Sequence, residues 1–135
     1  MFRFLIGLFL ILHGLVHLWL FTLSQRLVAF KPEMGRSGKS WLFTGLFGDS
    51  TTRLLASILF VVAATAFVVS GMAIFFRWDW WWSMLLGASI VSAVTLFLFW
   101  DGSVALIIQK GLIGFFISLV IFIFLLLARR PVFAW

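Results

Sequence analysis

The sequence contains no cysteine, so this chain forms no disulfide and supplies no thiolate to a zinc ion or an iron–sulfur cluster. Charged residues are scarce, at 10% of the chain against roughly one quarter in soluble domains. Only four of the 135 residues are acidic, against ten Lys and Arg. Few ionisable groups are therefore available for catalysis, and we expect a protein that is not an enzyme.

Hydrophobic residues make up 64% of the chain, and the mean hydropathy is +1.23. A soluble domain of this size leaves roughly a third of its unfolded surface in water, so it could not bury so many apolar side chains. Lipid must therefore be the solvent for most of the chain. The cationic excess is explained by anionic headgroups, and no basic stripe indicates nucleic-acid binding.

A helix that crosses a bilayer needs about 20 mainly apolar residues. Four segments approach this length, which predicts one transmembrane domain over 1–135 with spans at about 4–23, 54–76, 80–100 and 104–128. The last span combines 112–128 with the stretch 103–108, and the two are separated by a polar interruption at 109–111. The connections at 77–79 and 101–103 are short, so they join antiparallel neighbours. The predicted fold class is all-α, an integral membrane antiparallel four-helix bundle, with the first span retained as a helix rather than removed as a signal.

Tryptophan favours the headgroup level of a bilayer, where its ring is buried and its N–H is hydrated. One predicted interface is marked by Trp78, Trp80, Trp81, Trp82 and Trp135. The opposite one is marked by Trp19, Trp41 and Trp100. This placement is consistent with the four predicted spans.

The long connection over 24–53 contains a semi-apolar stretch at 41–47. Two interpretations stay open for this stretch: a helix in the interface or re-entering the bundle, or a loosely ordered loop. In the helical case, Gly48, Asp49 and Ser50 would provide the turn and the cap of the next helix.

Membrane helices associate through small residues and occasional polar contacts, and each predicted span has such a face. The first face comprises Arg3, Gly7, His13, Gly14, His17 and Ser24. The second repeats every seven residues, with Ala56/Ser57, Ala63/Ala64 and Ser70/Gly71. The third comprises Ser83, Gly87, Ser92 and Thr95, and the fourth Gly111, Gly114 and Ser118. We expect all four faces to point into the bundle.

His13 and His17 are the main candidates for chemistry, because ionisable residues inside a membrane span are costly and mark functional sites. Their i, i+4 spacing places both imidazoles on one helical face. The predicted helix ends bring Asp101, Gln109 and Lys110 to the same side of the membrane. These five residues form the predicted ligand or proton site.

Several roles are compatible with the histidine pair. In a structural role, each imidazole would donate to a backbone carbonyl or to a serine on a neighbouring helix. A metal would need a third ligand, such as Asp101 or Glu33. Haem needs axial ligands on opposite faces, and therefore a dimer or a ligand other than His. Proton transfer or quinone contact needs one imidazole near an interface.

Two other activities are disfavoured. The stretch Gly35-Arg-Ser-Gly-Lys-Ser40 has two residues between its glycines, where a phosphate-binding loop needs four. A transporter or channel needs a polar path, yet the second and third spans and the stretch 112–128 of the fourth carry no charge.

The overall layout, together with Arg3-Phe-Leu-Ile-Gly7 and Gly14, resembles the DoxX-like group of small four-helix bacterial membrane proteins. His17 stands where those proteins typically have a lysine, so no site residue is carried over. The resemblance implies a multi-pass protein of the bacterial cytoplasmic membrane that works beside a larger, often quinone-linked or oxidative-stress complex.

We therefore expect an accessory or scaffold subunit that packs against itself or against a larger membrane complex. The alternative is a membrane protein that binds a metal, haem or quinone through His13 and His17.

Overall fold

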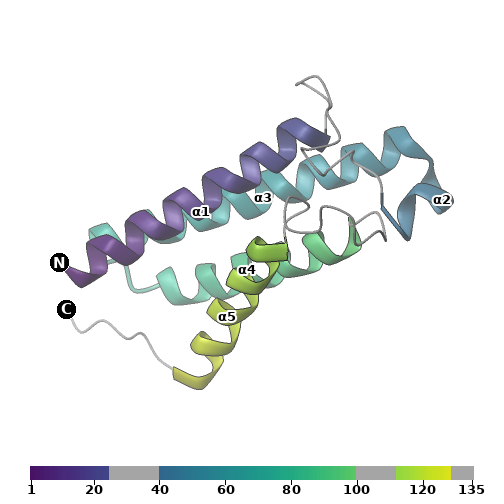
Figure 1. Cartoon of the computed structure of the whole chain (residues 1–135). Helices are drawn as coiled ribbons and strands as arrows, with labels where there is room; N and C mark the ends of the chain where they lie inside the picture. The colour runs from purple at the N-terminus through teal and green to yellow at the C-terminus, as the bar shows by residue number, and fades with distance from the viewer. Residues whose placement is uncertain (25–39, 100–111, 129–135) are drawn as a thin grey trace.

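The computed structural model describes residues 1–24, 40–99 and 112–128. These residues form helices and connections, with no strand among them. The helices are α1 (Phe2–Ser24), α2 (Phe43–Phe47), α3 (Asp49–Phe76), α4 (Trp81–Leu98) and α5 (Leu112–Ala128). The protein is all-α over the part of the chain that is described (Figure 1).

Three of these helices, α1, α3 and α4, contain stretches long and apolar enough to cross a membrane. The helix α5 is also apolar but has 17 residues, fewer than a full span requires. These lengths and compositions identify a membrane protein. The first three predicted spans are confirmed as helices, and α3 begins at Asp49 rather than at Leu54. The predicted extension of the fourth span over 104–111 lies outside the described residues.

The helices α1 and α3 lie side by side along most of their length and run in opposite directions (Figure 1). The helix α4 returns along α3, and α5 packs on α4 at a steeper angle. Two apolar clusters fill the interior, one with Leu10, Phe67, Ile74, Trp81, Leu85 and Leu125, the other with Ala56, Phe60, Leu96 and Phe99. Together the clusters contain side chains from α1, α3, α4 and α5.

Glycines allow α1 and α3 to approach closely. A Cβ atom on Gly7 would lie 3.0 Å from the carbonyl oxygen of Gly71, and one on Gly14 would lie 2.9 Å from that of Ala64. The two pairs are spaced by seven residues on both helices, as in a left-handed packing face. The predicted inward faces of the first two spans are thus confirmed at these positions.

The stretch at 41–47 contains a short helix, so the helical interpretation is confirmed for α2. Two hydrogen bonds join it to the end of α4: Ser40 Oγ donates to the carbonyl of Leu98, and Trp41 Nε1 donates to that of Phe97 at 3.0 Å. Both acceptors belong to the last turn of α4, where carbonyls lack helical partners. Ser40 and Trp41 therefore cap the C-terminal end of α4 with their side chains.

The turn between α2 and α3 lies at Gly48, whose positive φ of 81° suits glycine. Gly48 is also the N-cap of α3, so the predicted turn and cap are confirmed at this residue, whereas Asp49 and Ser50 belong to the first turn of the helix. Asp49 instead pairs with Arg53 at 3.0 Å, one turn further along the same helix. A carboxylate there also interacts favourably with the positive end of the helix dipole.

The α3–α4 turn is built on Arg77, which has a left-handed conformation with φ 59°. The N–H of Trp78 donates to the carbonyl of Ala73 at 2.8 Å, which closes α3 with the bond pattern of a Schellman motif. Trp78 and Trp80 are exposed and stacked, as expected of interface residues. Trp81 lies at the start of α4 beside these residues, but its side chain is buried in the apolar core.

The packed face of α4 also differs from the predicted one. Ser92 and Thr95 are buried as expected, but Ser83 and Gly87 are exposed. Ala88 and Ser89 take the inward positions instead. The rotation of α4 about its axis decides which residues face inward, and residue size alone does not specify that rotation.

Candidate functional site

His13 and His17 both point into the bundle, and their exposed fractions are 5% and 1%. Their ring centroids are 5.0 Å apart with the planes nearly perpendicular. The neighbouring polar groups are Ser92 of α4 and Ser118 of α5, each fully buried. The structure thus brings the two histidines to the place where α1, α4 and α5 meet.

Four hydrogen bonds connect these side chains. His17 Nε2 lies 2.6 Å from Ser92 Oγ, and Ser92 Oγ lies 2.7 Å from Ser118 Oγ. Ser118 Oγ lies 3.4 Å from His13 Nε2. His17 Nδ1 lies 3.0 Å from the carbonyl oxygen of His13. The path therefore begins and ends on His13, and we call these four residues the histidine–serine ring.

The carbonyl of His13 can only accept, so His17 must donate to it through Nδ1–H. In neutral His17, Nε2 is then an acceptor and receives the hydroxyl proton of Ser92. Ser92 in turn accepts from Ser118, which accepts from His13 Nε2–H. One consistent order of donors thus satisfies every bond and assigns opposite tautomers to the two histidines.

Phenylalanine rings surround the histidine–serine ring on its other sides. Phe67 of α3 packs edge-on against His13 with centroids 4.7 Å apart, and tilted against His17 at 5.4 Å. Phe9 stacks parallel to His13 one turn earlier on α1. These contacts fix the imidazole planes, and they provide the low-dielectric surroundings in which hydrogen bonds are strongest.

The bonding pattern restricts what the histidines can bind. Three of the four imidazole nitrogens take part in the ring of hydrogen bonds, so a metal on Nε2 of either residue would have to displace a serine. Among the described residues, no group of three His, Cys, Asp or Glu side chains is placed to hold a metal ion. Two perpendicular imidazoles from one helix face also do not bracket a haem.

The structure brings together two of the five predicted site residues. His13 and His17 are adjacent, whereas Asp101, Gln109 and Lys110 lie outside the described residues, as does the alternative ligand Glu33. Ser92 and Ser118 were expected to face inward as packing residues. A serine on a neighbouring helix was predicted as a partner of the histidines in their structural role, but the particular serine was not specified. Both serines lie near the centres of apolar spans, and this position was the feature of the sequence that could have indicated a polar partner for the histidines.

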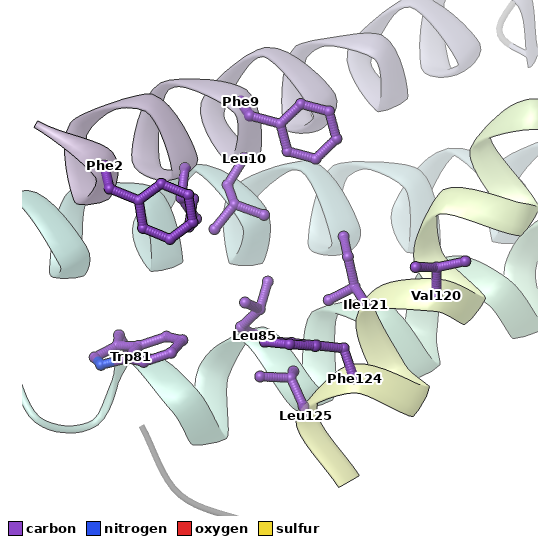
Figure 2. Close-up of a pocket in the computed structure, with 10 residues that line it drawn as sticks. Phe2, Phe9, Leu10, Trp81, Leu85, Val120, Ile121, Phe124 and Leu125 are labelled. Carbon is purple, nitrogen blue, oxygen red and sulfur yellow. The ribbon is translucent and has the colours of Figure 1, made fainter. Parts of the chain in front are cut away.

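An apolar cleft lies beside the ring of hydrogen bonds, between α1, α4 and α5 (Figure 2). Its volume is about 320 Å³. The lining residues are Phe2, Ile6, Phe9, Leu10, Trp81, Leu85, Val120, Ile121, Phe124 and Leu125. Leu10 and Ile121 lie three residues from His13 and Ser118 respectively, so the cleft begins about one turn from the α1–α5 hydrogen bond.

Comparison of the chain with models of known protein families, with curated proteins and with solved structures finds no match.

Proposed function

We propose that this protein is a non-enzymatic accessory or scaffold subunit, an antiparallel four-helix membrane bundle that packs against itself or against a larger membrane complex. In this arrangement α5, continued towards residue 104, supplies the fourth crossing. The termini then lie on one side of the membrane.

The outer face of α1 carries this proposal. It bears large apolar side chains at spacings of three and four residues, namely Leu5, Leu8, Leu12, Leu15 and Trp19. All five are between 47% and 57% exposed. Alternating steps of three and four are the pattern of a left-handed helix–helix contact. The outer α1 face is therefore suited to a partner helix.

The histidine–serine ring supports the same proposal from inside. It joins α1 to α4 and α5 through hydrogen bonds, and the hydrocarbon chains of lipid offer these side chains no alternative partners. A helix held in this way presents its opposite face in a fixed orientation. At 100° per residue, the outer α1 face lies roughly opposite His13 and His17. The ring thus serves to hold α1 as a docking helix.

The resemblance to DoxX-like proteins, carried by Arg3, Gly7 and Gly14, agrees with a subunit of this kind in the bacterial cytoplasmic membrane. Gly7 and Gly14 have a packing role in the close contact of α1 with α3. The partner that the resemblance suggests is a larger quinone-linked or oxidative-stress complex.

The second candidate is a ligand-binding protein in which His13 and His17 hold a metal, haem or quinone. The observation in its favour is the 5.0 Å separation of the two imidazoles inside the membrane domain. Binding of such a ligand would break hydrogen bonds of the histidine–serine ring, whereas these bonds would stay intact in a scaffold protein.

Gentle purification from the native membrane, followed by identification of associated proteins, tests the proposal. We expect a stoichiometric partner or a defined homo-oligomer that a His13→Ala, His17→Ala double variant weakens. The same preparation is then analysed for metal and for visible absorption. A stoichiometric metal or a Soret band that disappears in the double variant, with no partner retained, would favour ligand binding instead.

A further inference from the structure

The cleft between α1, α4 and α5 has a closed floor and an open rim. Its floor consists of Leu10, Trp81, Leu85 and Leu125, which are at most 4% exposed. The rim contains side chains that are about half or more exposed, namely Phe2, Phe9, Val120 and Phe124. Figure 2 shows these side chains converging from three helices around one space. An occupant of this space would lie over the floor residues, between the side chains of the rim.

The lining limits the chemistry of the occupant. It exposes no polar surface to the cleft, so nothing there can satisfy a carbonyl, a hydroxyl or a charge. An apolar cavity of this kind does not hold ordered water. A flexible hydrocarbon segment fits this lining, whereas a quinone ring would leave its carbonyl groups unpaired.

Cations lie at one end of the cleft. Arg3 directly follows the rim residue Phe2, and its guanidinium lies 4.7 Å from the centroid of the Phe4 ring. Arg77 lies four residues before the floor residue Trp81. Asp79 is the acidic residue of the same turn, so the described side chains there carry an excess of one positive charge. This end is also where α1 begins and where α3 turns into α4 (Figure 1). Exposed Trp78 and Trp80 place it at the headgroup level.

From these features we propose that the cleft binds one acyl chain of an anionic phospholipid, whose headgroup phosphate lies near Arg3 and Arg77. The apolar lining selects the chain, and the cations select the charge of the headgroup. This binding is independent of the accessory role, because the cleft and the outer α1 face lie on different sides of α1.

The direct test uses the unmodified protein and a phosphatidylglycerol that carries a diazirine in the middle of one acyl chain. After illumination in vesicles, we expect adducts on the floor residues Leu10, Leu85 and Leu125. Adducts confined to outward-facing positions such as Leu8 and Ile123 would overturn the proposal.

A second test fills the cleft. Native mass spectrometry of the Ile121→Trp variant should show at least a tenfold loss of retained phosphatidylglycerol. Val62→Trp is the matched control, because Val62 lines a separate apolar groove between α3 and α4. It should retain the lipid as the wild type does. Equal retention by the two variants would contradict the assignment of the site.

The headgroup is tested by competition between phosphatidylglycerol and phosphatidylcholine. The wild type should prefer the anionic lipid, and Arg3→Gln and Arg77→Gln should each reduce that preference roughly fivefold. An unchanged preference in the double variant would overturn the assignment of the phosphate to these cations.

Discussion

His17 and Ser92 form the shortest bond of the histidine–serine ring, with 2.6 Å between Nε2 and Oγ. Ser92 also bonds Ser118, so its hydroxyl is the junction through which α1, α4 and α5 are connected. This relationship explains why two ionisable residues can be buried in an apolar bundle, since three of their four ring nitrogens are paired within it. It also leads to the first prediction.

Replacement of Ser92 by alanine should destabilise the bundle by about 1–3 kcal/mol, because His17 and Ser118 both lose a buried partner. Unfolding in mixed micelles, followed by circular dichroism, measures the change. Ser89→Ala is the control, since Ser89 is equally buried but bonds the carbonyl of Leu86 on its own helix. Equal effects of the two substitutions would argue against a role of the ring in joining helices.

The two histidines should occupy opposite neutral tautomers. We expect Nδ1–H for His17 and Nε2–H for His13, because the backbone carbonyl of His13 determines the direction of the whole ring. Nitrogen-15 chemical shifts of labelled imidazoles in lipid bilayers distinguish these forms. The same tautomer at both positions would show that the donor order is different. In Ser92→Ala, the shift of His17 Nε2 should change more than that of His17 Nδ1.

Enlarging the glycines of α1 should separate α1 from α3. The Cβ atom of Gly14→Ala would lie 2.9 Å from a backbone oxygen of α3, and such overpacking costs typically about 1–3 kcal/mol. Gly87→Ala is the control, because a Cβ atom there meets no atom within 4 Å. The control should be neutral or stabilising, since alanine favours a helix more than glycine does. Denaturation midpoints of both variants test this difference.

Arg77→Gly should stabilise the α3–α4 turn by about 1 kcal/mol. Arginine adopts a φ of 59° there, a left-handed conformation that costs most side chains roughly 1–2 kcal/mol and glycine little. Part of the gain is offset by the greater freedom of glycine in the unfolded chain. Arg77→Ala separates conformation from charge, as it should show no such gain. Comparable stabilisation by both substitutions would mean that loss of the arginine charge is the cause.

The sequence was sufficient to predict helices at the four apolar segments, because a long apolar run can satisfy its backbone in lipid mainly as a helix. It was also sufficient to predict that Gly7, His13, Gly14 and His17 face inward. In each of these cases the residue type itself, without reference to other helices, determines the local structure or the inward orientation. The close approach at Gly14 and Ala64 follows from the same seven-residue spacing on both helices.

Features that depend on helix rotation were predicted less well. Trp81 was assigned to an interface with its neighbours, but it turns inward and packs in the core. Ser83 and Gly87 were expected inside and are exposed. The pairing of Ser92 with His17 likewise depends on the angle of α4 and on the position of α5. Residue types on one helix carry no information about these relative positions.

Docking of the outer α1 face onto a partner helix can be tested by a labelling scan in native membranes. The natural absence of cysteine allows single substitutions at Leu8, Leu12 and Leu15, each labelled with a benzophenone maleimide. Val94 and Ile90 of α4 have similar exposure and serve as controls. We expect protein adducts from the α1 positions and lipid adducts from the α4 positions. Lipid adducts alone from all five positions would contradict it.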